Sequence, residues 1–191
     1  MTLPGGYSVE REVALPLGDG VVLRADVYRP DGDGPHPVML MRTPYGKASA
    51  QQDVYAHPGY FARRGAIVVV QDMRGCGTSD GVFEPFRDEA RDGAAAVEWC
   101  ATLPGSSGAV FMYGYSYAGC AALLAASERP SGLAGILPAM ASACAGEGWT
   151  LRDGIVRAGF THGWATQLAA LAASRAGDAG AASRITQMRA R

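Results

Sequence analysis

The beginning of the chain alternates between apolar and polar positions, as a strand with one buried face does. Residues 9–17 place Val9 and Val13, followed by two leucines, on one face and glutamates on the other, and residues 21–28 repeat the alternation. The sequence Gly-Asp-Gly at 18–20 is typical of a turn. The two segments are therefore predicted to form an antiparallel hairpin.

Two apolar runs without alternation follow, at residues 38–41 and 66–70. Such runs are typical of parallel strands that are covered on both faces. Asp88 and Glu89 then open a predicted helix of about 15 residues, since acidic groups favour the positive end of the helix dipole. Four residues are expected to share one face of this helix: Ala90, Ala94, Val97 and Ala101.

A strand, a corner and a second helix are predicted within residues 109–127. The apolar strand at 109–114 leads into the sequence GYSYAG at 114–119, and a nearly all-apolar helix continues to Ser127. One more strand is predicted from Leu133 to Leu137. A hairpin followed by strand-helix alternation, with a corner after the fifth strand, is the order of an α/β-hydrolase sheet. The predicted fold is thus α/β, with an α/β-hydrolase sheet truncated after about the sixth strand.

Ser116 is the candidate nucleophile, because the corner would hold its hydroxyl out of the packed layers of the fold. A sharp strand-to-helix turn needs very small residues two before and two after the serine, and Gly114 and Ala118 meet this need. Two alternatives remain open at this point. In the first, Ser116 is an ordinary surface residue of the strand-to-helix turn. In the second, its hydroxyl caps the helix that follows.

The composition changes beyond about residue 141. Residues 142–191 are rich in Ala, Gly and Arg and contain no convincing strand. We therefore expect two parts: a partial α/β-hydrolase core at 1–141, and the beginning of a helical cap at 142–191, with a frayed end.

Composition and charge exclude several classes of function. The 191 residues are 48% hydrophobic and 18% charged, with a net charge of −1, so neither nucleic acid nor a membrane is expected as partner. No secretory leader is visible, and the expected location is the cytoplasm. Four cysteines at wide spacing are expected to be small buried thiols: Cys76, Cys100, Cys120 and Cys144. Nothing in the sequence indicates a metal or an organic cofactor.

Four motifs together resemble the cocaine esterase and Xaa-Pro dipeptidyl-peptidase family of serine hydrolases. They are LRADVYRP at 23–30, RTPYGK at 42–47, QDMRGCGTSDG at 71–81 and GYSYAG at 114–119. The resemblance covers roughly residues 8–150 and implies cleavage of ester or amide bonds through an acyl-serine intermediate. The implied substrate is a small-molecule ester, an amide or a peptide, and no cofactor is needed.

The resemblance also implies roles for individual residues. The oxyanion would be held by the backbone N–H of Tyr117 and the side chain of Tyr45, which follows a strand end. The alternative for Tyr45 is a loop aromatic that packs its ring and leaves its hydroxyl solvated. Trp149 and Trp164 resemble aromatic residues that line the family's acyl pocket, and packing within the cap is the alternative.

Two residues of the third motif, Asp72 and Arg74, are expected to brace their glycine-rich loop by hydrogen bonds. The loop does not have the spacing of a phosphate-binding loop. Neither residue is assigned a catalytic role.

The chain departs from the family where the acid and base of the triad are expected. Asp153 and His162 follow Ser116 in the right order, but both lie in a stretch without strands, so they are weak candidates. His36 and His57 are expected to be exposed loop residues. The chain is therefore expected to be the N-terminal part of an enzyme, and a partner chain would complete its sheet.

Two alternatives to the hydrolase remain open. The first is a truncated, non-catalytic fragment or pseudoenzyme that lacks the triad acid and histidine. The second is a small-molecule binding module that uses the aromatic crevice, since a fold does not fix a function.

Overall fold

The computed structural model describes residues 6–51, 56–144 and 146–189. The chain forms two compact units, unit 1 at Met1–Ala141 and unit 2 at Ser142–Arg191, which are described separately below.

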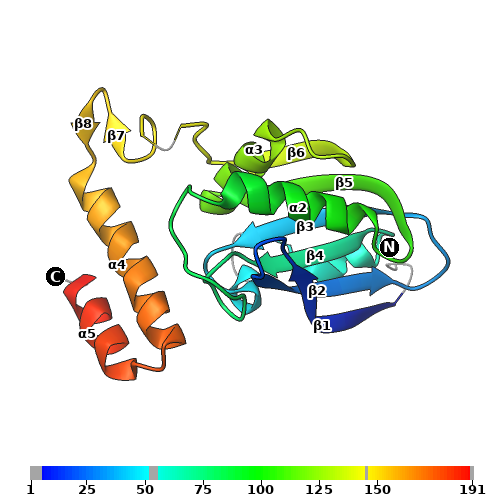
Figure 1. The fold of residues 1–191 in the computed structure, drawn as a ribbon, viewed down its shortest axis with the longest axis horizontal. Helices are drawn as coiled ribbons and strands as arrows, with labels where there is room; N and C mark the ends of the chain where they lie inside the picture. The colour runs from blue at the N-terminus through cyan, green and yellow to red at the C-terminus, as the bar shows by residue number, and fades with distance from the viewer. Residues whose placement is uncertain (1–5, 52–55, 145, 190–191) are drawn as a thin grey trace. The chain divides into compact units, whose positions relative to one another are not determined.

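Unit 1 consists of a sheet and the helices that cover it (Figure 1). In chain order its elements are β1 Tyr7–Pro16, β2 Val22–Pro30, β3 His36–Thr43, the 3₁₀ helix η1 Lys47–Gln51, α1 Pro58–Ala62, β4 Ile67–Asp72, α2 Glu89–Ala101, β5 Ser106–Tyr115, α3 Tyr117–Ser127 and β6 Leu133–Ala139. Within the described residues, six strands form one sheet in the order β1-β2-β4-β3-β5-β6.

The strand directions follow the prediction. β2 is antiparallel to β1 and to β4, whereas β3 is parallel to both β4 and β5, and β5 is parallel to β6. The predicted hairpin and the parallel strands after it are thus confirmed, as is the α/β-hydrolase order of the sheet. Because β3, β4 and β5 run in the same direction, the loops that follow them leave the sheet at one edge, which we call the carboxyl edge.

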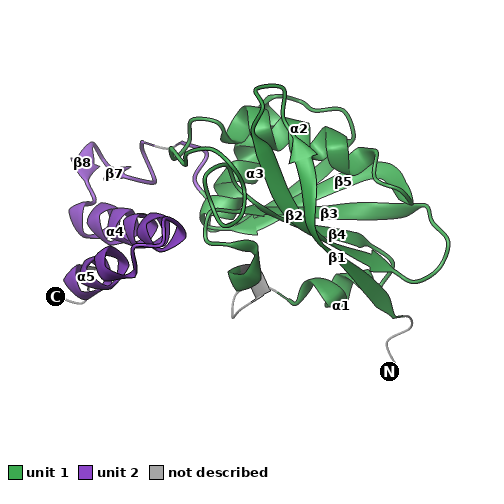
Figure 2. Cartoon of the chain, turned by 60° about the horizontal axis from the view of Figure 1, so that its bottom comes forward, with its two compact units in different colours: residues 1–141 green, residues 142–191 purple. Residues whose placement is uncertain are grey.

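Helices cover both faces of the sheet. Figure 2 shows α2 and α3 on one side and α1 on the other. On the first face, residues such as Val97 and Ala122 pack on the buried side chains of the central strands. On the second face, Ala62 of α1 packs with Tyr28, Met41 and Val70. The β4 strand is buried along its whole length, as its unbroken apolar run predicts.

The alternation predicted for the first strand is wrong at one point. A β-bulge interrupts the pairing of β1 with β2 between Glu10 and Val13, and Glu12 adopts a positive φ of 57°. One extra residue reverses the alternation of the side chains. As a result Val9 packs with the core of one face and Val13 with the core of the other.

Of the four residues expected to share one face of α2, only Val97 is buried. The buried residues of this helix are Glu89, Asp92, Gly93, Ala96, Val97 and Cys100. The helix therefore turns two acidic side chains toward the interior, which the sequence analysis did not anticipate. Their buried positions are explained by their partners, which are described in the next subsection.

Unit 2 contains two helices and a very short hairpin that the sequence did not predict: β7 Leu151–Arg152, β8 Ile155–Val156, α4 Ala158–Arg175 and α5 Ala179–Arg189. Asp153 and Gly154 form the turn of the hairpin and both have positive φ angles. The rings of Trp149, Phe160 and Trp164 pack on one another. None of the helices in the described residues is long and apolar enough to cross a membrane.

Candidate active site

Ser116 lies on a sharp turn at the carboxyl edge, between the end of β5 and the beginning of α3. Its backbone has φ 58° and ψ −124°, a conformation that residues other than glycine rarely adopt. Such a conformation costs on the order of 1–3 kcal/mol and persists only where the surrounding structure enforces it. The amide of Ser116 donates to the carbonyl of Ala139 at 2.9 Å, and its carbonyl accepts from the amide of Cys120 at 3.0 Å.

Close contacts between β5 and α3 enforce the turn. A Cβ atom on Gly114 would lie 2.4 Å from the backbone carbon of Ala118, and one on Gly119 would lie 2.7 Å from the carbonyl oxygen of Gly114. Both distances are too short for any real side chain. Gly114 is therefore required as predicted, and Gly119 is required as well, because the first turn of the helix lies directly against the strand end.

The hydroxyl of Ser116 makes no capping hydrogen bond to α3. This contradicts the alternative in which the serine serves as a helix cap. The next residue, Tyr117, is the first residue of α3, and amides of the first turn have no intrahelical acceptor. Its N–H also lies at the positive end of the helix dipole, which favours negative charge nearby. The local geometry of Ser116 and Tyr117 thus suits an oxyanion.

Tyr45 belongs to the same edge of the sheet. It follows Thr43, the last residue of β3, and its amide donates to the Thr43 hydroxyl at 3.2 Å. β3 lies beside β5, with Leu40 paired to Met112, so the loop that carries Tyr45 and the turn at Ser116 leave neighbouring strands at one edge. The Tyr45 side chain is half-buried.

Asp72 joins the Tyr45 loop to the glycine-rich loop after β4. Its buried carboxylate accepts hydrogen bonds from the ammonium group of Lys47 at 2.9 Å and from the amide of Thr78 at 3.1 Å. Burial opposes the charge on Lys47, but hydrogen bonds to Glu12 and Asp72 outweigh it and raise the pKa of the lysine. A Cβ on Gly77 would collide with the Asp72 carboxylate, so this loop closes tightly around the acid.

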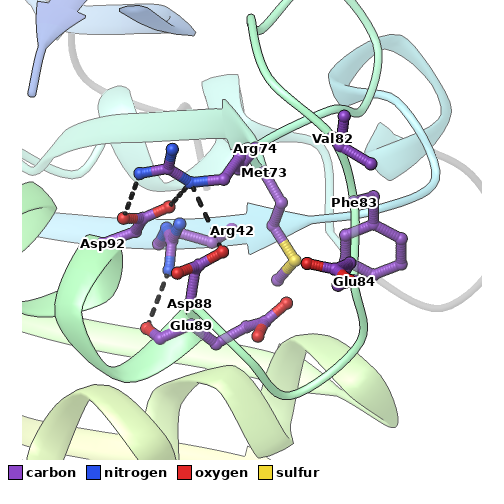
Figure 3. Close-up of a pocket in the computed structure, with 9 residues that line it drawn as sticks. All are labelled: Arg42, Met73, Arg74, Val82, Phe83, Glu84, Asp88, Glu89 and Asp92. Atoms are coloured by element: carbon purple, nitrogen blue, oxygen red, sulfur yellow. Dashed lines mark hydrogen bonds and ion pairs between the residues drawn. The ribbon is translucent and has the colours of Figure 1, made fainter. Parts of the chain in front are cut away.

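Arg74 braces the same loop against α2. Its guanidinium donates to both carboxylate oxygens of Asp92 at 2.8 Å (Figure 3). It also forms an ion pair with Asp19 at 2.9 Å. The hydrogen bonds to Asp92 raise the pKa of Arg74. In this structure Asp72 and Arg74 both bind neighbouring loops and helices, as expected from the sequence.

The sequence prediction missed a second layer of buried polar groups behind the turn. Arg42 is 1% exposed, and it donates to the side-chain carbonyl of Gln71 at 2.9 Å and to the backbone carbonyl of Glu89 at 3.2 Å. The Glu89 carboxyl group accepts from the Tyr117 hydroxyl at 2.7 Å. A signal was present in the sequence: Glu89 and Asp92 precede Ala96 and Cys100 at helical spacing, which places all four on one face.

Two pKa shifts follow from this burial. Burial raises the pKa of Glu89, and the hydrogen bond from Tyr117 and the charge of Arg42 offset this rise only in part. Burial, together with the nearby Glu89 carboxyl group, raises the pKa of Tyr117. The phenol therefore stays protonated and acts as a hydrogen-bond donor.

Neither histidine of unit 1 lies at the carboxyl edge. His36 begins β3 at the opposite edge and is half-buried, with Nδ1 3.0 Å from the carbonyl oxygen of Gly65, so the expectation of an exposed loop residue is wrong. His57 is exposed, and it accepts from the amide of Gly59 as the cap of α1. Both histidines are thus occupied with structural contacts.

The remaining candidate residues belong to unit 2. Asp153 lies in the β7–β8 turn and His162 on α4, and both are exposed. Among the described contacts, no hydrogen bond joins their side chains. Trp149 is 4% exposed and packs edge-on against Trp164, with 5.5 Å between the ring centroids.

The cysteines follow the prediction with one exception. Cys76, Cys100 and Cys120 are buried free thiols, whereas Cys144 is exposed, contrary to expectation. Burial raises the pKa of Cys120 to about 11. Within the described ranges, no group of three His, Cys, Asp or Glu side chains is placed to hold a metal ion.

Comparisons with known proteins agree with this fold. Cocaine esterase from Rhodococcus sp. (strain MB1 Bresler) is 42% identical over 145 residues, which are 73% of this chain and 25% of that protein. A CocE/NonD family hydrolase from Staphylococcus aureus has the same fold, with a TM-score of 0.80 and 24% identity over 88% of this chain and 34% of that one. An α-amino acid ester hydrolase has a TM-score of 0.63 and 27% identity over 71% of this chain and 25% of that one.

The chain thus spans about a quarter to a third of the length of these relatives. The family described as X-Pro dipeptidyl-peptidase (S15 family) matches residues 19–191, which include the strained turn at Ser116 and the loops after β3 and β4. With this match over most of its length, the chain belongs to the S15 family of hydrolases.

Proposed function

We propose that this chain carries the nucleophile and the oxyanion hole of a serine hydrolase that cleaves ester or amide bonds. The observation that carries the proposal is the strained backbone of Ser116 at the carboxyl edge, with a hydroxyl that does not cap the helix behind it. Backbone strain that the surrounding structure maintains is common where a group must be presented for chemistry.

In the proposed reaction the Ser116 oxygen attacks the carbonyl carbon of the substrate, and the serine proton passes to a general base. The carbonyl oxygen becomes an oxyanion, which accepts hydrogen bonds from the Tyr117 amide and the Tyr45 hydroxyl. Collapse of this intermediate expels the alcohol or amine and leaves an acyl-serine, which water then hydrolyses. The relatives support this class of reaction, since they are described as esterases, ester hydrolases and peptidases.

The general base is proposed to come from outside unit 1, because His36 and His57 have structural roles away from the carboxyl edge. The outer edge of the sheet supports the further proposal that an additional strand, from a partner chain, pairs with β6. Leu137 and Met140, on and next to this edge strand, are 58% and 68% exposed. Edge strands of this kind are templates for pairing.

Labelling with a fluorophosphonate probe tests the proposal directly. The probe phosphonylates an activated serine, and intact mass reports the stoichiometry. We expect one probe per folded parent chain and none on Ser116→Ala. Oxyanion donors alone leave a rate of order 10³-fold over water even without a base, so slow labelling of the parent is still expected. A folded parent that stays unlabelled would establish the non-catalytic alternative.

A further inference from the structure

Tyr117 is held by its side chain as well as by its place in α3. The side chain is fully buried, and its ring packs against Phe83 at 5.7 Å and Phe86 at 5.1 Å between centroids. Both phenylalanines come from the loop before α2, and Phe86 has a positive φ of 69°. Tyr117, whose backbone amide would donate to the oxyanion, is therefore held in place by the loop that precedes α2.

The Tyr117 hydroxyl makes two short hydrogen bonds. It accepts from the backbone amide of Phe86 at 2.7 Å and donates to Oε1 of Glu89 at 2.7 Å. A phenol has a single hydroxyl proton. Because the oxygen accepts the hydrogen bond from the Phe86 amide, the phenol proton is available to donate to Glu89. The first residue of α2 is thus tied to the first residue of α3.

Glu89 is itself fixed to the sheet. Its backbone carbonyl accepts from Arg42, which bonds to Gln71 at the end of β4. Figure 3 shows the Glu89 carboxyl group pointing away from Asp88 and Asp92. Glu89 also lines a small cavity of about 10 Å³. Its second oxygen, Oε2, is buried and has no hydrogen-bond partner among the described residues.

A buried carboxyl group without an ion-pair partner is costly. The hydrogen bond from Tyr117 is the largest of the interactions that offset this cost, and the charge of Arg42 adds to it. We propose that Glu89 is a positioning residue for the hydrolase reaction: by accepting from the Tyr117 hydroxyl, it holds the Tyr117 amide in the direction that an oxyanion requires. This inference rests on the proposed function, because the amide matters only if an oxyanion forms.

The test compares rates of fluorophosphonate labelling in four variants. Glu89→Gln keeps an acceptor at the same place, Glu89→Leu removes it, Tyr117→Phe removes the donor, and Glu98→Leu is a matched control on the exposed side of α2. Thermal unfolding of each variant identifies the folded fraction. Rates are expressed per folded molecule, so that a loss of stability alone does not count.

We expect Glu89→Leu and Tyr117→Phe to lower the labelling rate by about 10- to 100-fold, since loss of one oxyanion donor costs about 10²–10³-fold and here the donor is only misaligned. The effect should fall on the chemical step rather than on probe affinity. Glu89→Gln and Glu98→Leu should stay within about threefold of the parent. A fifth variant that combines Glu89→Leu with Tyr117→Phe should be no slower than either single variant, because both substitutions remove the same hydrogen bond.

The outcomes separate the two proposals. If the parent is labelled and a folded Glu89→Leu or Tyr117→Phe reacts at the parent's rate, the positioning role is overturned while the proposed function stands. If a folded parent is not labelled at all, the proposed function fails and the positioning role fails with it. If Glu89→Leu does not fold, the Tyr117→Phe rate decides.

Discussion

Helices α3 and α4 are similar in composition but differ in environment. Both are rich in alanine and contain glycine, yet most residues of α3 are buried and no residue of α4 is. In α3 the glycine at position 119 permits a contact with the backbone of β5, whereas Gly163 of α4 has open space around it. Glycine therefore permits close packing in one helix, whereas in the other it only lowers the helix propensity.

The two helices also begin differently. Tyr117 at the start of α3 is bound by a buried carboxyl group and two aromatic rings. Arg157 at the start of α4 lies at the surface, donates to the backbone carbonyl of Trp149 at 3.2 Å and stacks over Phe160. The strained backbone of Ser116 and the buried carboxyl group of Glu89 thus both lie at the start of α3, the helix that follows the candidate nucleophile.

The largest expected contrast is in cysteine reactivity. Cys120 in α3 is buried with a pKa raised from 9.0 to about 11, and Cys144 of unit 2 is exposed. Because the thiolate is the reactive form, two pKa units alone slow Cys120 by about 100-fold. Iodoacetamide with peptide mass mapping should modify Cys144 first and leave Cys120 intact. Equal rates would contradict the close packing of α3.

The next contrast is a matched pair of glycine substitutions. Gly119→Ala places a methyl group 2.7 Å from the Gly114 carbonyl oxygen, and overpacking of this kind destabilises by about 1–3 kcal/mol. The free energy of unfolding in urea measures this loss. It should also slow fluorophosphonate labelling, since the turn at Ser116 must shift. A variant as stable as the parent would show that β5 and α3 do not need this close approach.

Gly163→Ala in α4 should have a smaller effect of the opposite sign. Nothing lies within 4 Å of the added methyl group, and alanine favours a helix over glycine by about 0.5–1 kcal/mol. Circular dichroism at increasing temperature should show a more stable helix, with no change in labelling of Ser116. A destabilised variant would mean that the face of α4 at Gly163 is packed.

The smallest contrast concerns pH. Glu89 faces Arg42 of β3, Asp92 of α2 and Tyr117 of α3, and its folded pKa lies above 4.5. The folded state then binds more protons than the unfolded state between pH 4.5 and the folded pKa, so this group's contribution to stability falls as pH rises through that window. Glu89→Gln removes the titration.

Urea unfolding at about pH 4.5 and about pH 8 tests this sign. The stability of Glu89→Gln relative to the parent should rise with pH, and a substitution in unit 2 that changes no titratable group, such as Gly163→Ala, should not reproduce that rise. Parallel stability curves for Glu89→Gln and the parent would contradict a raised pKa at Glu89.

Several features were predictable because they depend on neighbours in the sequence. The unbroken apolar run at 67–70 fixed a buried central strand, and the small residues around Ser116 indicated the turn. The alternation of apolar and polar residues failed to predict the buried face of β1, because one extra residue in the strand changes the direction of the side chains that follow it. The bulge near Glu12 reversed the alternation of β1, and no turn signal in the sequence marks it.

The sequence by itself thus determined the order of the six strands of unit 1 and of helices α2 and α3, the turn at Ser116 and the family to which the chain belongs. Only the tertiary structure decided which polar residues are buried together. Glu89 and Tyr117 are separated by 28 positions, and Arg42 and Glu89 by 47. Such pairs form because α2 and α3 pack on the same face of the sheet, and helical periodicity can show that a side chain faces inward but cannot name its partner.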